Sequence, residues 1–161
     1  MPHTVDVTTP SDREVRVTRT FDAPRSLIFD CHTKPDLVRR WLLGPPGWTM
    51  PVCEIDFRVG GRYRYVWRSD ADGSEFGLGG QFREIAAPER IVHTERPEGS
   101  EGGDALCTLT LAEEGGRTVL TQMIMFPSRE VRDQVLQTGM TDGMAASYDR
   151  LEGLLEAQRV A

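Results

Sequence analysis

Lysine and long apolar runs are scarce in this sequence. Lys34 is the single lysine beside 18 arginines, a skew that we attribute to genome composition rather than to function. No apolar run approaches the roughly 18 residues that cross a bilayer. The first dozen residues also lack the basic and apolar regions of a signal peptide. We therefore expect a cytoplasmic protein with no membrane partner.

Cysteine and positive charge are limited as well. The three cysteines are odd in number, widely spaced and embedded in apolar segments. This pattern argues against a disulfide framework and predicts reduced, buried thiols at Cys31, Cys53 and Cys107. The formal net charge of -6 argues against nucleic acid as a partner, because nucleic acid requires a basic face.

Several catalytic motifs are missing too. No pair or triple of His, Cys and carboxylate residues has the spacing of metal ligands. There is no Gly-x-Ser-x-Gly elbow for a nucleophilic serine. The glycine-rich residues 77–82 lie in a predicted strand with no helix after it, whereas a phosphate cradle requires that helix. We therefore expect no metal and no cofactor.

The chain of 161 residues is long enough for one domain. Residues 1–12 are polar, contain two prolines and show no apolar period, so we expect a flexible N-terminal tail. Residues 13–157 form the predicted domain. Within it, Val15, Val17 and Arg19 fall on one side of a strand. Two short helices then follow on either side of Pro35.

The remaining residues alternate with a period of two and end in a helix. Asp72-Gly73 marks one hairpin turn and residues 114–116 mark another, which predicts an antiparallel sheet of about six or seven strands. Ser128 is the expected cap of the C-terminal helix, and Gly139 and Gly143 are positions where it can bend. An apolar stripe of this helix should face the sheet: Met140, Met144, Tyr148, Leu151 and Leu155.

The order of these elements corresponds to an α+β helix-grip fold, in which a curved sheet wraps a long C-terminal helix. The stretches RTFDAPRSLIF, PDLVRRWLLGPPGW, DFRVGGRYRY, GQFREIAAPERIVHT, GGRTVLT and GMTDGMAASYDRLEGLL occur in one order between residues 19 and 155. On these stretches the chain resembles the START/Bet v-like (SRPBCC) superfamily, in the branch of the C-terminal domain of activators of the 90-kDa heat-shock chaperone ATPase. The resemblance implies a hydrophobic cavity between the sheet and the last helix. It also implies functions that range from lipid carriage to polyketide cyclisation and self-resistance.

The stretch WLLGPPGW suggests one wall of that cavity, because Trp41 and Trp48 stand at the two ends of a stiff turn. An empty void of ~300 Å³ would cost about 7 kcal/mol, so a cavity must be small, wet or occupied. We expect a non-enzymatic protein that binds a small apolar or aromatic ligand through Trp41, Trp48, Tyr63, Tyr65, Trp67, Phe76, Leu78, Phe82, Met140, Met144 and Tyr148.

Two other functions are compatible with the sequence. In the first, the same cavity belongs to a cyclase or hydratase, with Tyr65, Glu84 and His93 as the acid–base candidates. In the second, the domain is a co-chaperone-like interaction module, which an apolar patch on its outer surface would favour. A homodimer is compatible with either, although the sequence indicates no interface.

Overall fold

The computed structural model describes residues 4–160 and contains every predicted element. Before the first predicted helix lie β1 (Asp6–Thr8) and β2 (Glu14–Phe21). The helices α1 (Arg25–Thr33) and α2 (Pro35–Trp41) follow. Six strands come next: β3 (Trp48–Ile55), β4 (Arg62–Ser69), β5 (Glu75–Ala86), β6 (Arg90–Pro97), β7 (Ala105–Glu114) and β8 (Arg117–Met125). The chain ends with α3 (Arg129–Gln137) and α4 (Met140–Val160).

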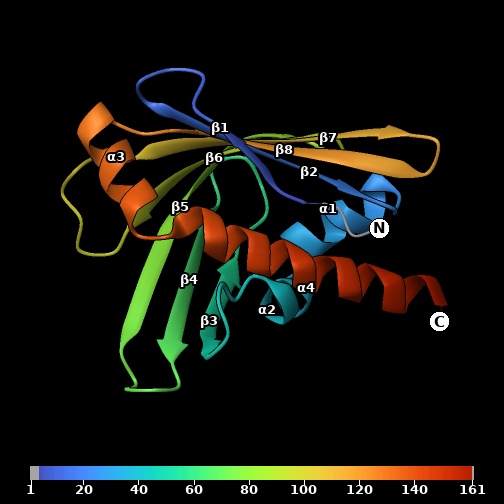
Figure 1. Cartoon of the computed structure of the whole chain (residues 1–161), viewed down its shortest axis with the longest axis horizontal. Coiled ribbons are helices and arrows are strands. Elements are labelled where there is room, and N and C mark those ends of the chain that lie inside the picture. Colours follow the sequence, from blue (N-terminus) through green and yellow to red (C-terminus); the bar gives the residue numbers. More distant parts are fainter. Residues whose placement is uncertain (1–3, 161) are drawn as a thin grey trace.

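The strands form one antiparallel sheet in the order β1-β2-β8-β7-β6-β5-β4-β3. The long helix α4 crosses the inner face of this curved sheet, and α1 and α2 lie beside it (Figure 1). This arrangement confirms the α+β helix-grip fold. Within residues 4–160, no helix combines the length and the hydropathy needed to cross a bilayer.

The N-terminal segment differs from its prediction. The expectation of a flexible tail over residues 1–12 is wrong for β1, whose residues pair with Arg16, Val17 and Thr18 of β2. An edge strand is held by backbone hydrogen bonds, which require no apolar period, so composition alone could not reveal it. This strand raises the number in the sheet to eight. Residues 1–3 lie outside the described part of the chain.

The C-terminal helix is divided in two. The Ser128 hydroxyl accepts a hydrogen bond from the Val131 amide at 3.2 Å, which confirms the predicted cap of α3. Gly139 then adopts a φ of 83°, in the left-handed region that favours glycine, and separates α3 from α4. In α3 no residue is buried, whereas Tyr148, Leu151 and Leu155 of α4 belong to the core. The predicted apolar stripe therefore lies on α4.

An arginine lies in the core under α4. As the alternation predicts, Arg19 points inward with Val15 and Val17, and it is only 2% exposed. Its Nη1 lies 2.7 Å from Asp149 Oδ1 and its Nη2 lies 3.3 Å from Glu152 Oε2. Among the described residues, its Nε has no hydrogen-bond partner. These two ion pairs fix α4 to β2.

The sheet bends sharply between β5 and β6. A Cβ atom at Gly80 would lie 1.8 Å from the backbone oxygen of Thr94, so only glycine allows this approach of the two strands. A register shift follows between Phe82 and Glu84. Beyond the bend, β3, β4 and the first half of β5 extend away from the rest of the sheet (Figure 1). The inner face of this part of the sheet therefore extends beyond the region that α4 covers (Figure 1).

Gly153 offers a test of the helical conformation of α4. It is an exposed residue in the helix interior, and a Cβ atom there would meet nothing within 4 Å. Gly153→Ala is expected to raise the free energy of unfolding by about 0.5–1 kcal/mol, because alanine lowers the backbone entropy of the unfolded chain. Urea unfolding measures this change. The control Gly139→Ala should destabilise, since φ is positive there.

Candidate functional site

The loop at residues 42–47, between α2 and β3, forms hydrogen bonds with both α4 and β4. The Gly44 amide donates to Ser147 Oγ at 2.9 Å, and Arg150 Nη1 donates to the Gly44 carbonyl oxygen. On the other side, Trp67 Nε1 donates to the Leu42 carbonyl oxygen at 2.7 Å. These bonds hold the loop as a fixed wall between the helix and the sheet.

The two tryptophans that flank this loop have different environments. Trp41 is 2% exposed, its Nε1 donates to the Cys31 carbonyl oxygen at 2.8 Å, and its ring stacks on Tyr148 at 5.9 Å. The prediction that both indole N–H groups lie at a cavity mouth is therefore wrong for Trp41, because its ring is packed in the core and its N–H group is hydrogen-bonded to Cys31. Trp48 is half-buried at the start of β3, opposite Ser69.

The aromatic face of β4 forms as predicted, and it becomes progressively more exposed toward the hairpin tip. Tyr63, Tyr65 and Trp67 pair with Gly80, Leu78 and Phe76 of β5. Tyr63 is buried, Tyr65 and Leu78 are half-buried, and Phe76 is 48% exposed. The rings of Trp67 and Phe76 stack at 6.0 Å. We call four of these side chains the inner apolar patch: Tyr65, Trp67, Phe76 and Leu78.

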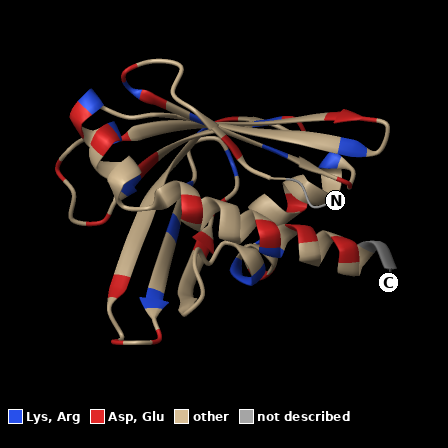
Figure 2. Ribbon diagram, in the orientation of Figure 1, with Lys and Arg blue, Asp and Glu red and all other residues tan. Residues whose placement is uncertain are grey.

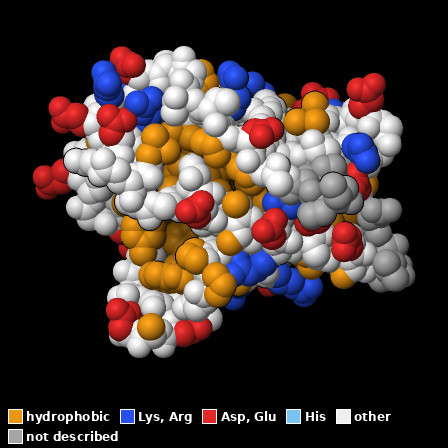
Figure 3. Space-filling model, in the orientation of Figure 1, with side chains coloured by type: hydrophobic (Ala, Val, Ile, Leu, Met, Phe, Trp, Pro, Cys, Tyr) orange, Lys and Arg blue, Asp and Glu red, His pale blue; other side chains and the backbone are white. Residues whose placement is uncertain are grey.

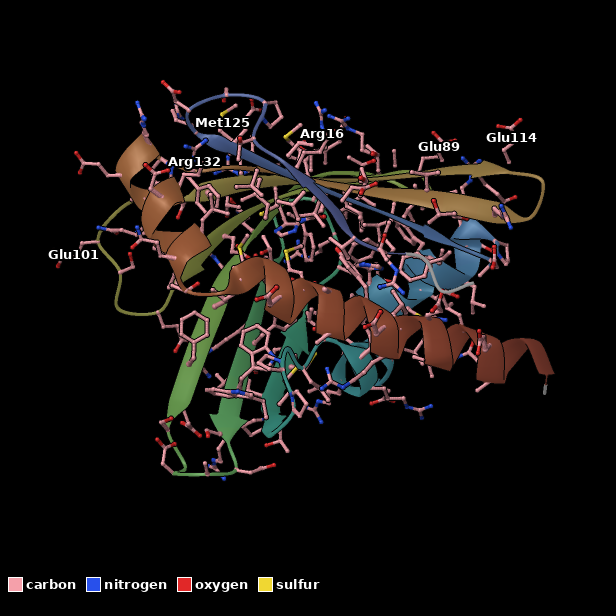
Figure 4. All side chains as sticks on the ribbon, viewed as in Figure 1. Arg16, Glu89, Glu101, Glu114, Met125 and Arg132 are labelled. Carbon is pink, nitrogen blue, oxygen red and sulfur yellow. The ribbon has the colours of Figure 1, made fainter. Side chains whose placement is uncertain are left out.

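Apolar side chains gather around this patch, over β4 and β5 and beside the start of α4 (Figure 3). Met140 and Met144 of α4 are half-buried and pack against the core cluster. By contrast, Phe82 and Tyr148 are buried core residues. Side chains fill the space between the sheet and the middle of α4 (Figure 4). The predicted ligand-binding residues are therefore divided between a packed core and an exposed patch.

His93 lies at the inner face of β6 and contacts Tyr63. Its Nδ1 is 3.0 Å from the Tyr63 hydroxyl oxygen, and that hydroxyl donates to the Thr94 carbonyl oxygen at 2.7 Å. With the tyrosine proton committed to Thr94, Nδ1–H of His93 is the donor, and it is shared between the Tyr63 hydroxyl oxygen and the Thr94 carbonyl oxygen, which lies 3.1 Å from Nδ1. Burial lowers the pKa of His93, so the ring is neutral at pH 7. Among the described residues, its Nε2 has no hydrogen-bond partner.

Glu84 does not reach the inner face. Its Oε2 accepts a hydrogen bond from exposed Arg90 Nε at 2.7 Å. The register shift after Phe82 reverses the alternation of β5, so Ile85 points inward in its place and pairs with Ile91. The prediction of Glu84 as an acid–base candidate is therefore wrong, because a β-bulge changes which face a residue occupies.

Glu95 is the inner-face carboxyl that the sequence analysis missed. It is half-buried and pairs with Ala105 of β7. The register that joins Gly79 to Arg96 and Phe82 to His93 places Gly80 opposite Glu95 on the other side. Burial raises the pKa of Glu95 to about 7. Its position two residues after His93 was the available signal, because such residues share a face of a strand.

Two surface hollows lie away from the inner apolar patch. The larger, about 840 Å³, is on the opposite face of β4–β6, where Arg64 pairs with Glu98 and Arg96 with Asp104. The smaller is lined by residues 22–24 and 115–117. The ion pairs of the larger hollow are exposed and contribute little binding energy, so neither hollow replaces the patch as a candidate site.

Comparison with known families decides the identity of the fold. The sequence model described as Activator of Hsp90 ATPase homolog 1-like protein matches residues 22–156. The chain belongs to this family. This agrees with the resemblance to the SRPBCC superfamily, of which the helix-grip fold is typical.

Several solved structures are similar to most of the chain. A protein of Rhodobacter sphaeroides is 29% identical with a TM-score of 0.89, and the match covers 96% of this chain and 99% of the other. A protein of Chromobacterium violaceum is 26% identical with a TM-score of 0.80, over 91% and 99% of the two chains. The AHSA1-like protein of Aeromonas hydrophila, at 18% identity, covers 86% and 93% with a TM-score of 0.71 and shares the fold. A comparison with curated proteins gave no match.

Proposed function

We propose that this protein binds a small apolar or aromatic molecule on the inner apolar patch and acts as a carrier, a sensor or a sequestering protein. The observation that carries this proposal is the exposure of large apolar side chains on the inner face of a sheet. Phe76 is 48% exposed and Trp67 is half-buried although both face the side of the sheet that α4 covers elsewhere. The family is compatible with ligand binding as well as with a co-chaperone-like role.

A ligand that covers the patch gains affinity from apolar burial, at roughly 25 cal/mol per Å² removed from water. This gain must exceed the cost of association, which is at least about 4 kcal/mol.

The alternatives receive less support. The cyclase or hydratase hypothesis loses Glu84, and His93 already uses Nδ1 in its contact with Tyr63. On the outer face, exposed Leu106 pairs with exposed Met125, and a third exposed apolar side chain, Val119, lies farther along β8. Because Val119 is six residues from Met125, these side chains do not form the contiguous patch of a few hundred Å² that marks an interaction surface.

Ligand binding is tested with the neutral dye N-phenyl-1-naphthylamine and with native mass spectrometry of the gently purified protein. Phe76→Ala and Trp67→Ala are each expected to weaken dye binding at least tenfold, because each removes an aromatic surface from the patch. Leu106→Ala is the matched control, since it removes a similarly exposed apolar side chain from the outer face. Equal affinity in all four proteins, with no released molecule, would reject the proposal.

A further inference from the structure

The inner apolar patch leads from the hairpin tip to a carboxyl group. Trp67 and Phe76 form the first row and Tyr65 and Leu78 form the second. Tyr63 and Gly80 form the third row, and Glu95 continues this row on β6. Rows on one face of a sheet are about 6.7 Å apart, so about 13 Å separates the first row from Glu95 along the strands. The patch is therefore apolar over its length and acidic at its inner end.

Glu95 has no cationic partner in the described part of the chain, unlike Glu75 and Glu84 of the neighbouring strand β5. Glu75 pairs with Arg68 and Glu84 pairs with Arg90, both on exposed surface. Among the described side chains, those of residues 4–158, no arginine, histidine or lysine lies within ion-pair distance of Glu95, and no hydrogen-bond donor reaches its carboxylate. A half-buried carboxylate without a partner is costly, which the raised pKa of Glu95 reflects.

The immediate neighbours leave this carboxyl uncovered. Gly80 and Ala105, on either side of Glu95 in the sheet, have the smallest side chains. Tyr63 commits its hydroxyl proton to the Thr94 carbonyl oxygen, so it does not serve Glu95 as a donor. An ionised carboxylate only accepts hydrogen bonds. A bound molecule that contacts it must therefore bring the donor.

The surroundings also favour a positive group. Aromatic faces attract cations, and Tyr63 and Tyr65 lie close to Glu95: burial raises the pKa of both phenols, and the charge of Glu95 raises it further. Acidic residues outnumber basic ones, 25 to 19. They also recur along the length of α4, with Asp142 in its first turn (Figure 2). Both the local and the overall field thus attract a cation.

We propose that the ligand is an apolar molecule about 13 Å long that carries a protonated amine at one end, with the apolar body on the inner apolar patch and the ammonium on Glu95. This inference rests on the proposed function of the patch. The ammonium replaces the missing cation, and its three N–H donors supply the hydrogen bonds that the protein does not.

Three probes with the same chain and different head groups test this inference: decylammonium, 1-decanol and decanoate, measured by isothermal titration calorimetry at pH 8. We expect decylammonium to bind at least tenfold more tightly than 1-decanol and decanoate to bind weakest. Glu95→Gln should reduce the affinity for decylammonium to that for 1-decanol, without weakening 1-decanol. The control Glu84→Gln, which removes an exposed carboxylate, should preserve the preference.

The outcomes separate this inference from the proposed function. If all three probes bind equally, lose affinity in Phe76→Ala, and are unaffected by Glu95→Gln, the patch binds ligands but the amine selectivity is wrong. If no probe shows binding that depends on Phe76, the proposed function itself fails. Decylammonium binding that survives Phe76→Ala would reflect the acidic surface and would also reject the inference. Circular dichroism of each variant checks that the fold is retained.

Discussion

Replacing Asp149 and Glu152 together by Asn and Gln is expected to lower the free energy of unfolding by roughly 3–5 kcal/mol, the usual cost of leaving a buried charge without its partners. Arg19 carries that charge, with a side chain that is 1% exposed. The two carboxylates are its only ion-pair partners among residues 4–160, and they reach it from one face of α4. Urea unfolding followed by far-UV circular dichroism measures the loss.

The opposite substitution, Arg19→Met, should be much milder. It removes the buried charge together with its desolvation cost, keeps most of the side-chain volume, and leaves the carboxylates free to hydrate. Asp149 is already 69% exposed. In the Arg19→Met background, the two amide substitutions should change stability by less than about 0.5 kcal/mol. If they are equally harmful in both backgrounds, their effect does not pass through Arg19.

The stability of the protein should depend on pH through Glu95. Burial raises its pKa to about 7 in the folded protein, from an ordinary value of 4.5. Between these values the folded state binds the proton more strongly than the unfolded state, so the free energy of unfolding falls as the pH rises. From pH 5 to pH 8 this amounts to about 2–3 kcal/mol, which Glu95→Gln should abolish.

The comparison must be made as a difference between the two proteins at each pH. Burial lowers the pKa of His32 to about 4 and also lowers that of His93, so both histidines destabilise the fold as the pH falls. Because both proteins keep these histidines, the difference isolates Glu95. Parallel pH profiles of wild type and Glu95→Gln would show that the carboxyl is solvated in the folded protein.

Much of the fold was predictable because local rules agreed with tertiary packing. The period of two placed Val15, Val17 and Arg19 inward and put Tyr63, Tyr65 and Trp67 on one face. The Asp72-Gly73 turn and the Ser128 cap lie at the predicted positions. Such features depend on residues a few positions apart, so the sequence contains them directly.

The site was less predictable because it depends on contacts between distant segments. Trp41 and Trp48 flank the same loop, yet packing against Tyr148 on α4 places Trp41 in the core. Glu84 points outward because of a bulge that forms only when β5 pairs with β6. Alternation predicts a face as long as the register is regular, and it fails where pairing inserts a residue.

The sequence by itself therefore determined the helix-grip fold, the aromatic face of β4 and the absence of a disulfide framework. Only the tertiary structure decided which aromatic residues are core and which remain exposed, since that depends on how far α4 extends over the bent sheet. It also decided that Glu95 lies beside the patch without an ion-pair partner among the described side chains. A carboxyl group acquires a raised pKa from the groups that surround it in space, and those groups come from strands far apart in the chain.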